Sequence, residues 1–240
     1  MSLLQLNEPR QEDDFLAASD AATRVLSVAA VENDFVERVY AKLASVYDVF
    51  FGPTLHAGRL EAIGRLAIRR GDQILEVGVG TGINAMLYPR GCHVTGIDIS
   101  SQMLDKAHVR LLNRDIRNIE LLQMDAADLK FPDNSFDIVY APYLISVVPD
   151  PVKVASEMRR VCRTGGRIVF LNHFLSTNPL LSRAERLISP LTVHVGFKAD
   201  LDLGAFLAQA RLRPITIEKV NIPRIWSLVT CTKESLGARR

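Results

Sequence analysis

The chain has 240 residues, of which 48% are hydrophobic and 23% charged, and its formal net charge at neutral pH is +2. This length and composition predict a single folded domain over residues 1–240, and the near-neutral charge excludes nucleic acid as the main partner. No apolar run approaches the roughly 20 residues of a membrane-spanning helix, and no signal peptide is recognisable. We therefore expect a soluble, cytoplasmic protein that at most touches a membrane.

The charges are unevenly distributed along the chain. Residues 1–50 carry four basic and nine acidic side chains, whereas residues 211–240 carry seven basic and two acidic ones. The basic C-terminal part is suited to an anionic surface. The three cysteines, Cys92, Cys162 and Cys231, fit no metal-binding spacing, so we expect free thiols and no metal site.

The pattern of the first 70 residues predicts helices that flank or cover the domain. Apolar residues recur at helical spacing in residues 15–26, again in residues 35–46, and at Leu60, Ile63, Leu66 and Ala67. Because these helices precede the first expected strand, we predict that residues 1–70 form a lid or membrane-facing segment.

From residue 71 the pattern changes to alternating strands and helices, which predicts a parallel sheet covered on both faces. The last two strands have only a short link, so they must be antiparallel. We therefore predict an α/β fold with a Rossmann-like, mostly parallel seven-stranded sheet, an antiparallel C-terminal hairpin and N-terminal lid helices. The core spans residues 71–240 with an insertion at 174–200. The expected strands are 73–77, 93–98, 119–124, 136–141, 167–172, 214–220 and 226–232.

The first strand runs into a glycine-rich turn at Gly78, Gly80 and Gly82. Glycines let the backbone turn sharply and approach a ligand closely. Position 83 is Ile, so the dinucleotide pattern GxGxxG is not met. Glu76 lies near the C-terminal end of the strand, two residues before Gly78, where it suits a cationic amino group and would repel a pyrophosphate.

Two further acids follow the next strands. Asp98 ends the second strand, where a carboxylate can accept hydrogen bonds from ribose hydroxyls. Asp125 and Ala126 follow the third strand, where they suit the adenine amino group and ring. Because open α/β sheets bind ligands at the carboxyl ends of their strands, these acids converge on one crevice.

The segments EVGVGTG, GIDIS, QMDAADLKFPDNSFDIV and TGGRIVF resemble class I methyltransferases that depend on S-adenosylmethionine (SAM). The resemblance covers about residues 71–172. It implies SAM as the cofactor and S-adenosylhomocysteine as its product. Glu76 and the glycine loop would hold the methionine part, Asp98 the ribose, and Asp125 with Ala126 the adenine. We also place Ile99, Met103 and Tyr140 at the cofactor.

Shorter motifs resemble the bacterial phosphatidylethanolamine N-methyltransferases. They are Val46–Pro53 with His56, Gly58 and Arg59 beyond it, the residues around Asn172-His173-Phe174, and Lys219–Pro223. This resemblance implies a phospholipid substrate at an anionic membrane surface, with reversible, peripheral binding. The family's N-terminal helix is typically basic, whereas residues 1–50 are acidic here. Membrane contact would then depend on apolar burial or on other segments.

Tyr47, Tyr143 and His173 are the candidate catalytic residues, because an amine must lose its proton before it can accept a methyl group. Tyrosine rings can also hold an ammonium group. Asp48 is a candidate for substrate contact. Each residue has a structural alternative: Tyr47 in the core of the lid, Tyr143 as a cover on the adenosine, His173 as a structural histidine, and Asp48 as the cap of a turn.

A phospholipid phosphate requires cationic donors. Arg224 beside Trp226, Lys219 nearby, and Arg183 and Arg186 in the long insertion are the candidates, and we assign Arg186, Lys219, Arg224 and Trp226 to the substrate site. The insertion is either an interfacial helix or an amphipathic helix packed on the sheet.

The expected activity is stepwise N-methylation of phosphatidylethanolamine towards phosphatidylcholine. A C-methyltransferase of a quinone precursor and a small-molecule amine methyltransferase are the alternative enzymes. A SAM-binding protein without catalysis is the alternative of another class. The sequence does not specify the oligomeric state.

Overall fold

The computed structural model describes residues 55–176, 183, 201–221 and 224–234. These residues belong to one compact unit, Val31–Arg240. The two helices expected before residue 50 and almost all of the insertion at 174–200 lie outside the described residues. The prediction of a single domain over residues 1–240 stays a prediction.

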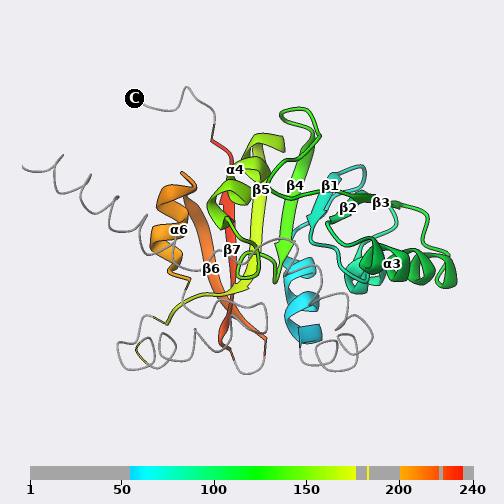
Figure 1. Cartoon of the computed structure of the whole chain (residues 1–240), viewed down its shortest axis with the longest axis horizontal. Coiled ribbons are helices and arrows are strands. Elements are labelled where there is room, and N and C mark those ends of the chain that lie inside the picture. The colour runs from blue at the N-terminus through cyan, green and yellow to red at the C-terminus, as the bar shows by residue number, and fades with distance from the viewer. Residues whose placement is uncertain (1–54, 177–182, 184–200, 222–223, 235–240) are drawn as a thin grey trace, which may run out of the picture. The chain divides into compact units, whose positions relative to one another are not determined.

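Seven strands form one sheet in the order β3-β2-β1-β4-β5-β7-β6 (Figure 1). Strands β1 to β5 pair in parallel, and β7 pairs antiparallel with both β5 and β6. The predicted α/β fold with an antiparallel C-terminal hairpin is therefore confirmed. The strands are β1 (Gln73–Val77), β2 (His93–Asp98), β3 (Ile119–Gln123), β4 (Phe136–Pro142), β5 (Cys162–His173), β6 (Pro214–Val220) and β7 (Trp226–Thr232).

Short helices connect or flank these strands. They are a helix at residues 55–65, the 3-10 helix η2 (Ile83–Leu87), α3 (Ser101–Asn113), α4 (Pro151–Val161) and α6 (Leu203–Gln209). Three of them begin at a polar residue whose side chain accepts a hydrogen bond from a free backbone N–H of the first turn: Ser100 for α3, Asp150 for α4 and Asp202 for α6. Such caps fix where each helix begins.

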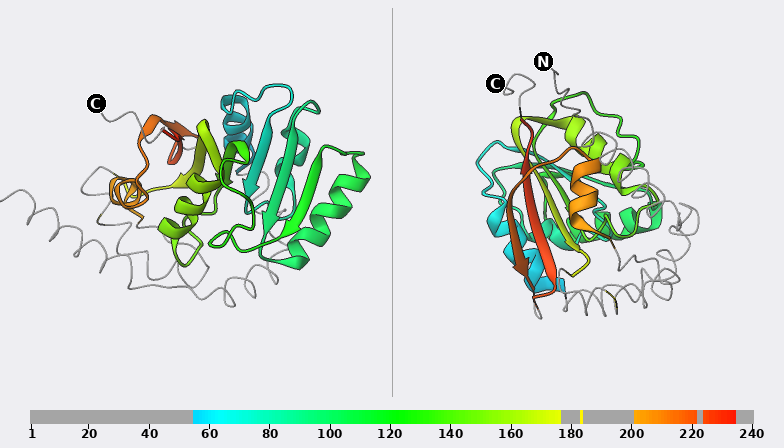
Figure 2. Two further views of the ribbon diagram at one scale, coloured as in Figure 1. Left: turned by 90° about the horizontal axis from the view of Figure 1, so that it is seen from above. Right: turned by 90° about the vertical axis from the view of Figure 1, so that its left-hand side faces the viewer.

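Both faces of the sheet are covered. The helix at 55–65 buries Leu55, Ala62 and Ile63 in a core that includes residues of β1, β4, β5 and β7. On the opposite face, Phe206 of α6 meets Phe170 of β5 edge to face, with 5.3 Å between ring centroids. Figure 2 shows these two helices on opposite sides of β6 and β7. The helix at 55–65 is thus a flank of the sheet, and it borders the carboxyl ends of the central strands.

Candidate functional site

The loop after β1 is tied to β2. The backbone N–H groups of Gly78 and Val79 both donate to the carbonyl of Ile97, at 2.9 Å each. Gly78 has φ +76, and a Cβ there would lie 2.8 Å from Leu144 Cδ1. A side chain at this position would both strain the backbone and collide with Leu144. The loop is therefore held close to the segment that follows β4, and a cavity opens between them.

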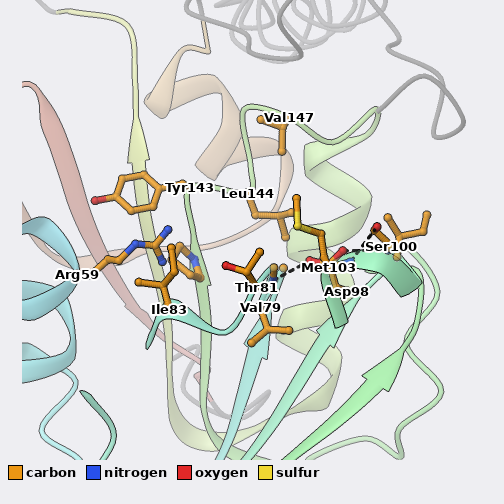
Figure 3. A pocket seen from close by; sticks show the side chains of 14 residues that line it. Arg59, Val79, Thr81, Ile83, Asp98, Ser100, Met103, Tyr143, Leu144 and Val147 are labelled. Carbon is orange, nitrogen blue, oxygen red and sulfur yellow. Dashed lines mark hydrogen bonds between the residues drawn. The ribbon is translucent and has the colours of Figure 1, made fainter. Parts of the chain in front are cut away.

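The cavity is lined by the glycine loop, the end of β2, the start of α3, the segment after β4 and one residue of the helix at 55–65 (Figure 3). Such a crevice at the carboxyl ends of parallel strands is where α/β sheets bind ligands. Six residues that the sequence singled out lie in its wall: Gly78, Gly80, Asp98, Ile99, Met103 and Tyr143. Val79, Thr81, Ser100 and Leu144 are among the other lining residues.

Asp98 is fixed by backbone donors. One carboxylate oxygen accepts from the N–H of Gly80 at 2.8 Å and the other from the N–H of Ser100 at 2.9 Å (Figure 3). Each oxygen can accept more than one hydrogen bond, so the oriented carboxylate can still receive a ligand hydroxyl. This geometry suits the ribose contact predicted for Asp98.

Glu76 lies behind the cavity and is not part of its wall. It is 1% exposed, and its two oxygens accept from Asn84 Nδ2 at 2.6 Å and from Tyr88 Oη at 2.7 Å. Burial raises the pKa of this carboxyl from its ordinary 4.5 to about 7, although both hydrogen bonds oppose the rise. The predicted contact with the cofactor amino group stays a prediction, and Asn84 stands between Glu76 and the cavity residue Arg59.

Four other predicted cofactor residues also lie outside the cavity wall. Tyr140 is fully buried in β4, paired with Glu76 of β1. Gly82 packs on α3, where a Cβ would lie 3.1 Å from that of Ala107. Asp125 accepts from the N–H of Ala127 at 2.8 Å in the turn after β3, and Ala126 next to it is half-buried. Their assignment to the cofactor stays a prediction.

Tyr143, Trp226 and His173 form an aromatic row beside the cavity. Ring centroids are 4.9 Å apart for Tyr143 and Trp226, and 5.9 Å apart for His173 and Trp226, with both pairs edge to face. Tyr143 has φ +57, which is strained for a tyrosine, and its hydroxyl donates to the carbonyl of Leu55 at 3.1 Å. Two of the three predicted catalytic residues, Tyr143 and His173, thus pack against the same tryptophan.

Of the remaining predicted substrate and catalytic residues, some lie in the β6–β7 hairpin and the others lie outside the described residues. Lys219 Nζ donates to Ser227 Oγ at 3.0 Å, and Arg224 is exposed in the turn between β6 and β7. Tyr47, Asp48 and Arg186 lie outside the described residues.

Arg59 also lies in the cavity wall, although the sequence indicated it only as part of a family motif and not as a site residue. It is 6% exposed, its Nη1 donates to Asn84 Oδ1 at 3.1 Å, and its guanidinium carbon lies 4.9 Å from the centre of the Tyr143 ring. A signal was present: Arg59 is one helical turn after buried Leu55 and one before buried Ile63. An arginine on the apolar stripe of a helix is rarely buried unless its charge is paired.

Two absences concern only the described part of the chain. In it, no group of three or more His, Cys, Asp or Glu side chains could hold a metal ion. None of the helices described there is long and apolar enough to cross a membrane.

Comparison with known proteins gives consistent matches. Residues 75–170 match a family described as a methyltransferase domain. The chain is 39% identical over 186 residues to the phosphatidylethanolamine N-methyltransferase of Cereibacter sphaeroides, across 77% of this chain and 91% of the relative. It is 33% identical over 146 residues to a demethylmenaquinone methyltransferase of Listeria monocytogenes, across 57% of this chain and 61% of that relative.

Solved structures share the fold. Phosphoethanolamine N-methyltransferase 2 of Haemonchus contortus, in complex with phosphomonomethylethanolamine and S-adenosylhomocysteine, aligns with a TM-score of 0.70 at 18% identity, over 84% of this chain and 60% of that one. A SAM-dependent methyltransferase of Aquifex aeolicus aligns with a TM-score of 0.56 at 18% identity, over 73% and 89%.

The fold and the cavity define an α/β protein with a ligand-binding crevice at the carboxyl ends of its parallel strands. The matches specify the family: the chain belongs to the class I SAM-dependent methyltransferases. SAM fits the cavity residues, because an oriented carboxylate suits the ribose and a buried arginine lies across the same cavity.

Proposed function

We propose that the enzyme methylates the amine of phosphatidylethanolamine stepwise towards phosphatidylcholine. The observation that carries this proposal is the 39% identity to a phosphatidylethanolamine N-methyltransferase over 91% of that protein's length. The aromatic row beside the cavity supports the proposal, because tyrosine and tryptophan rings bind an ammonium group by cation–π attraction and leave room for methyl groups.

The chemistry requires a deprotonated amine. SAM supplies the methyl group, and the attacking nitrogen must approach it opposite the sulfur. A free amine of this kind has a pKa near that of lysine, about 10.4, so the site must desolvate it or accept its proton. We propose His173 as the proton acceptor or relay, with Tyr143 and Tyr47 beside the amine and Asp48 as a further contact.

We propose that cations of the C-terminal hairpin and of the insertion bind the head-group phosphate. Lys219 is oriented by Ser227, Arg224 is exposed in the same hairpin, and Trp226 belongs to the aromatic row. Arg186 is the candidate from the insertion. The excess of basic residues in 211–240 suits an anionic membrane. We therefore propose a cytoplasmic enzyme that binds the membrane peripherally and reversibly.

C-methylation of a quinone precursor is the second candidate, and the 33% identity to a demethylmenaquinone methyltransferase favours it. A Pseudomonas putida ubiquinone/menaquinone C-methyltransferase is 35% identical over 151 residues, across 59% of that relative. A quinone ring also enters an apolar site next to a membrane, but it has no phosphate. The hairpin cations therefore distinguish the two acceptors.

The test uses purified full-length protein, radiolabelled SAM and vesicles with or without phosphatidylethanolamine. We expect labelled mono-, di- and trimethylated lipid from the phosphatidylethanolamine vesicles and no label in free ethanolamine. Arg224→Ala should reduce the rate with the lipid, whereas Arg117→Ala, which removes an exposed arginine after α3, should not. Transfer to a demethylated quinone without transfer to lipid would refute the proposal.

A further inference from the structure

The cavity contains a buried cation whose charge no described residue neutralises directly. Arg59 is 6% exposed and reaches the cavity wall from the helix at 55–65 (Figure 3). Among the described residues, no carboxylate lies within ion-pair distance of its guanidinium, and its Nε has no hydrogen-bond partner. An unpaired buried cation is expensive, so such a group is expected where a ligand supplies the anion.

The nearest acid in this network does not substitute for that anion. Glu76 reaches Arg59 only through Asn84, which donates to Glu76 at 2.6 Å and accepts from Arg59 at 3.1 Å. Burial raises the pKa of Glu76 to about 7, so this carboxyl carries only part of a negative charge near neutral pH. Glu76 therefore does not fully compensate the charge of the guanidinium, which faces the cavity.

The guanidinium is also held in a fixed orientation. On one side, Nη1 of Arg59 donates a hydrogen bond to Asn84. On another side, the Tyr143 ring lies 4.9 Å from the guanidinium carbon. Gly58 permits this arrangement, since a Cβ there would lie 2.6 Å from the Tyr143 hydroxyl oxygen. A cation that is oriented before the ligand arrives loses little conformational entropy on binding.

The position of Arg59 in the cavity identifies the anion. Asp98, Ser100 and Met103 lie at one end, where a carboxylate suits the ribose, and Arg59 and Tyr143 lie at the other (Figure 3). SAM has one anionic group, the α-carboxylate at the opposite end of the molecule from its adenine. We propose that Arg59 binds the α-carboxylate of SAM, with Asn84 and Glu76 as positioning residues. This proposal depends on membership of the SAM-dependent family and not on the identity of the acceptor.

The test measures ligand binding without any acceptor. Isothermal titration calorimetry compares S-adenosylhomocysteine with S-adenosyl-3-thiopropylamine, which lacks only the carboxylate. Charge-assisted hydrogen bonds predict that the wild type binds the decarboxylated ligand on the order of 10- to 100-fold more weakly. In Arg59→Gln the affinity for S-adenosylhomocysteine should fall by a similar factor, and the difference between the two ligands should largely disappear.

Two further variants complete the design. Arg59→Lys keeps the charge and should restore part of the discrimination. Arg65→Gln is the matched control, because Arg65 lies on the same helix in surface ion pairs with Glu61 and Glu218. It should leave both affinities unchanged, and circular dichroism checks that each variant is folded.

Several results would overturn the proposal. The wild type could bind both ligands equally, a result that needs no variant to fold. Arg59→Gln could weaken both ligands by the same factor, which would indicate a structural role. It could also leave S-adenosylhomocysteine binding intact and raise only the KM for lipid, in which case Arg59 binds the head-group phosphate.

Discussion

The buried carboxyl of Glu76 makes the stability of the fold depend on pH in an unusual direction. Its pKa is raised from 4.5 to about 7 in the folded protein, mainly by burial. Between these two values the folded state binds more protons than the unfolded state, so stability falls as the pH rises. The loss begins near pH 4.5 and is complete above about pH 7.

The size of this effect follows from the two pKa values. Each pH unit between them corresponds to about 1.4 kcal/mol, so the full loss is about 3 kcal/mol. That is a large fraction of the roughly 5–15 kcal/mol that stabilise a typical domain. Glu76→Gln removes the titrating group but keeps an oxygen to accept from Asn84. Relative to the wild type, this variant should therefore gain about 3 kcal/mol between pH 4.5 and pH 8.

Urea unfolding at a series of pH values, followed by circular dichroism, measures the difference. Glu157→Gln serves as a control of opposite sign, because its hydrogen bond with Arg160 lowers the pKa of Glu157. The wild type should lose stability relative to that variant as the pH falls through the acidic range. A constant difference between the wild type and Glu76→Gln across pH 4.5–8 would show that Glu76 does not titrate as described.

Three other substitutions test the cavity and the core. Gly78→Ala should lower stability and S-adenosylhomocysteine affinity more than Gly80→Ala, because only at Gly78 would a Cβ collide with Leu144, although both positions have positive φ; equal effects in thermal melts and calorimetry would contradict this. Asp98→Asn should weaken S-adenosylhomocysteine by on the order of 10-fold in calorimetry, since an amide offers one oxygen to two backbone donors; unchanged affinity would exclude the ribose contact. Phe206→Ala should cost about 3–5 kcal/mol in urea unfolding because the ring is fully buried, and a loss below about 1 kcal/mol would show that the core collapses around it.

Most strands were predictable because their signals are local. The predicted bounds of β1, β2, β6 and β7 agree with the structure, since each is a short segment rich in Val, Ile, Leu or Thr next to a turn. Strand β5 begins five residues earlier than predicted. Its register shifts between Phe136 and Ile138 of β4, and Gly165 and Gly166 lie within the strand instead of before it. A register shift depends on the neighbouring strand, so the sequence of one strand alone does not predict it.

The site was predictable only in part, for a similar reason. Position at the end of a strand indicates which residues reach the crevice, and Asp98 lies in its wall. Position along a strand does not indicate which way a side chain points. Glu76, for example, does not line the cavity and accepts hydrogen bonds from Asn84 and Tyr88. The role of Arg59 depends on the packing of a helix against strands distant in sequence, so its partners Asn84 and Tyr143 appear only in the fold.

The central claim is that the methyl groups go to the nitrogen of a phosphatidylethanolamine head group. The most direct measurement incubates the purified enzyme with SAM carrying a trideuterated methyl group and phosphatidylethanolamine vesicles, and then fragments the lipids by mass spectrometry. We predict head-group fragments that carry one, then two, then three deuterated methyl groups, while the acyl chains stay unlabelled. If the protein binds SAM but the lipid head groups stay unlabelled, or if the label appears on a quinone ring instead, the central claim is wrong.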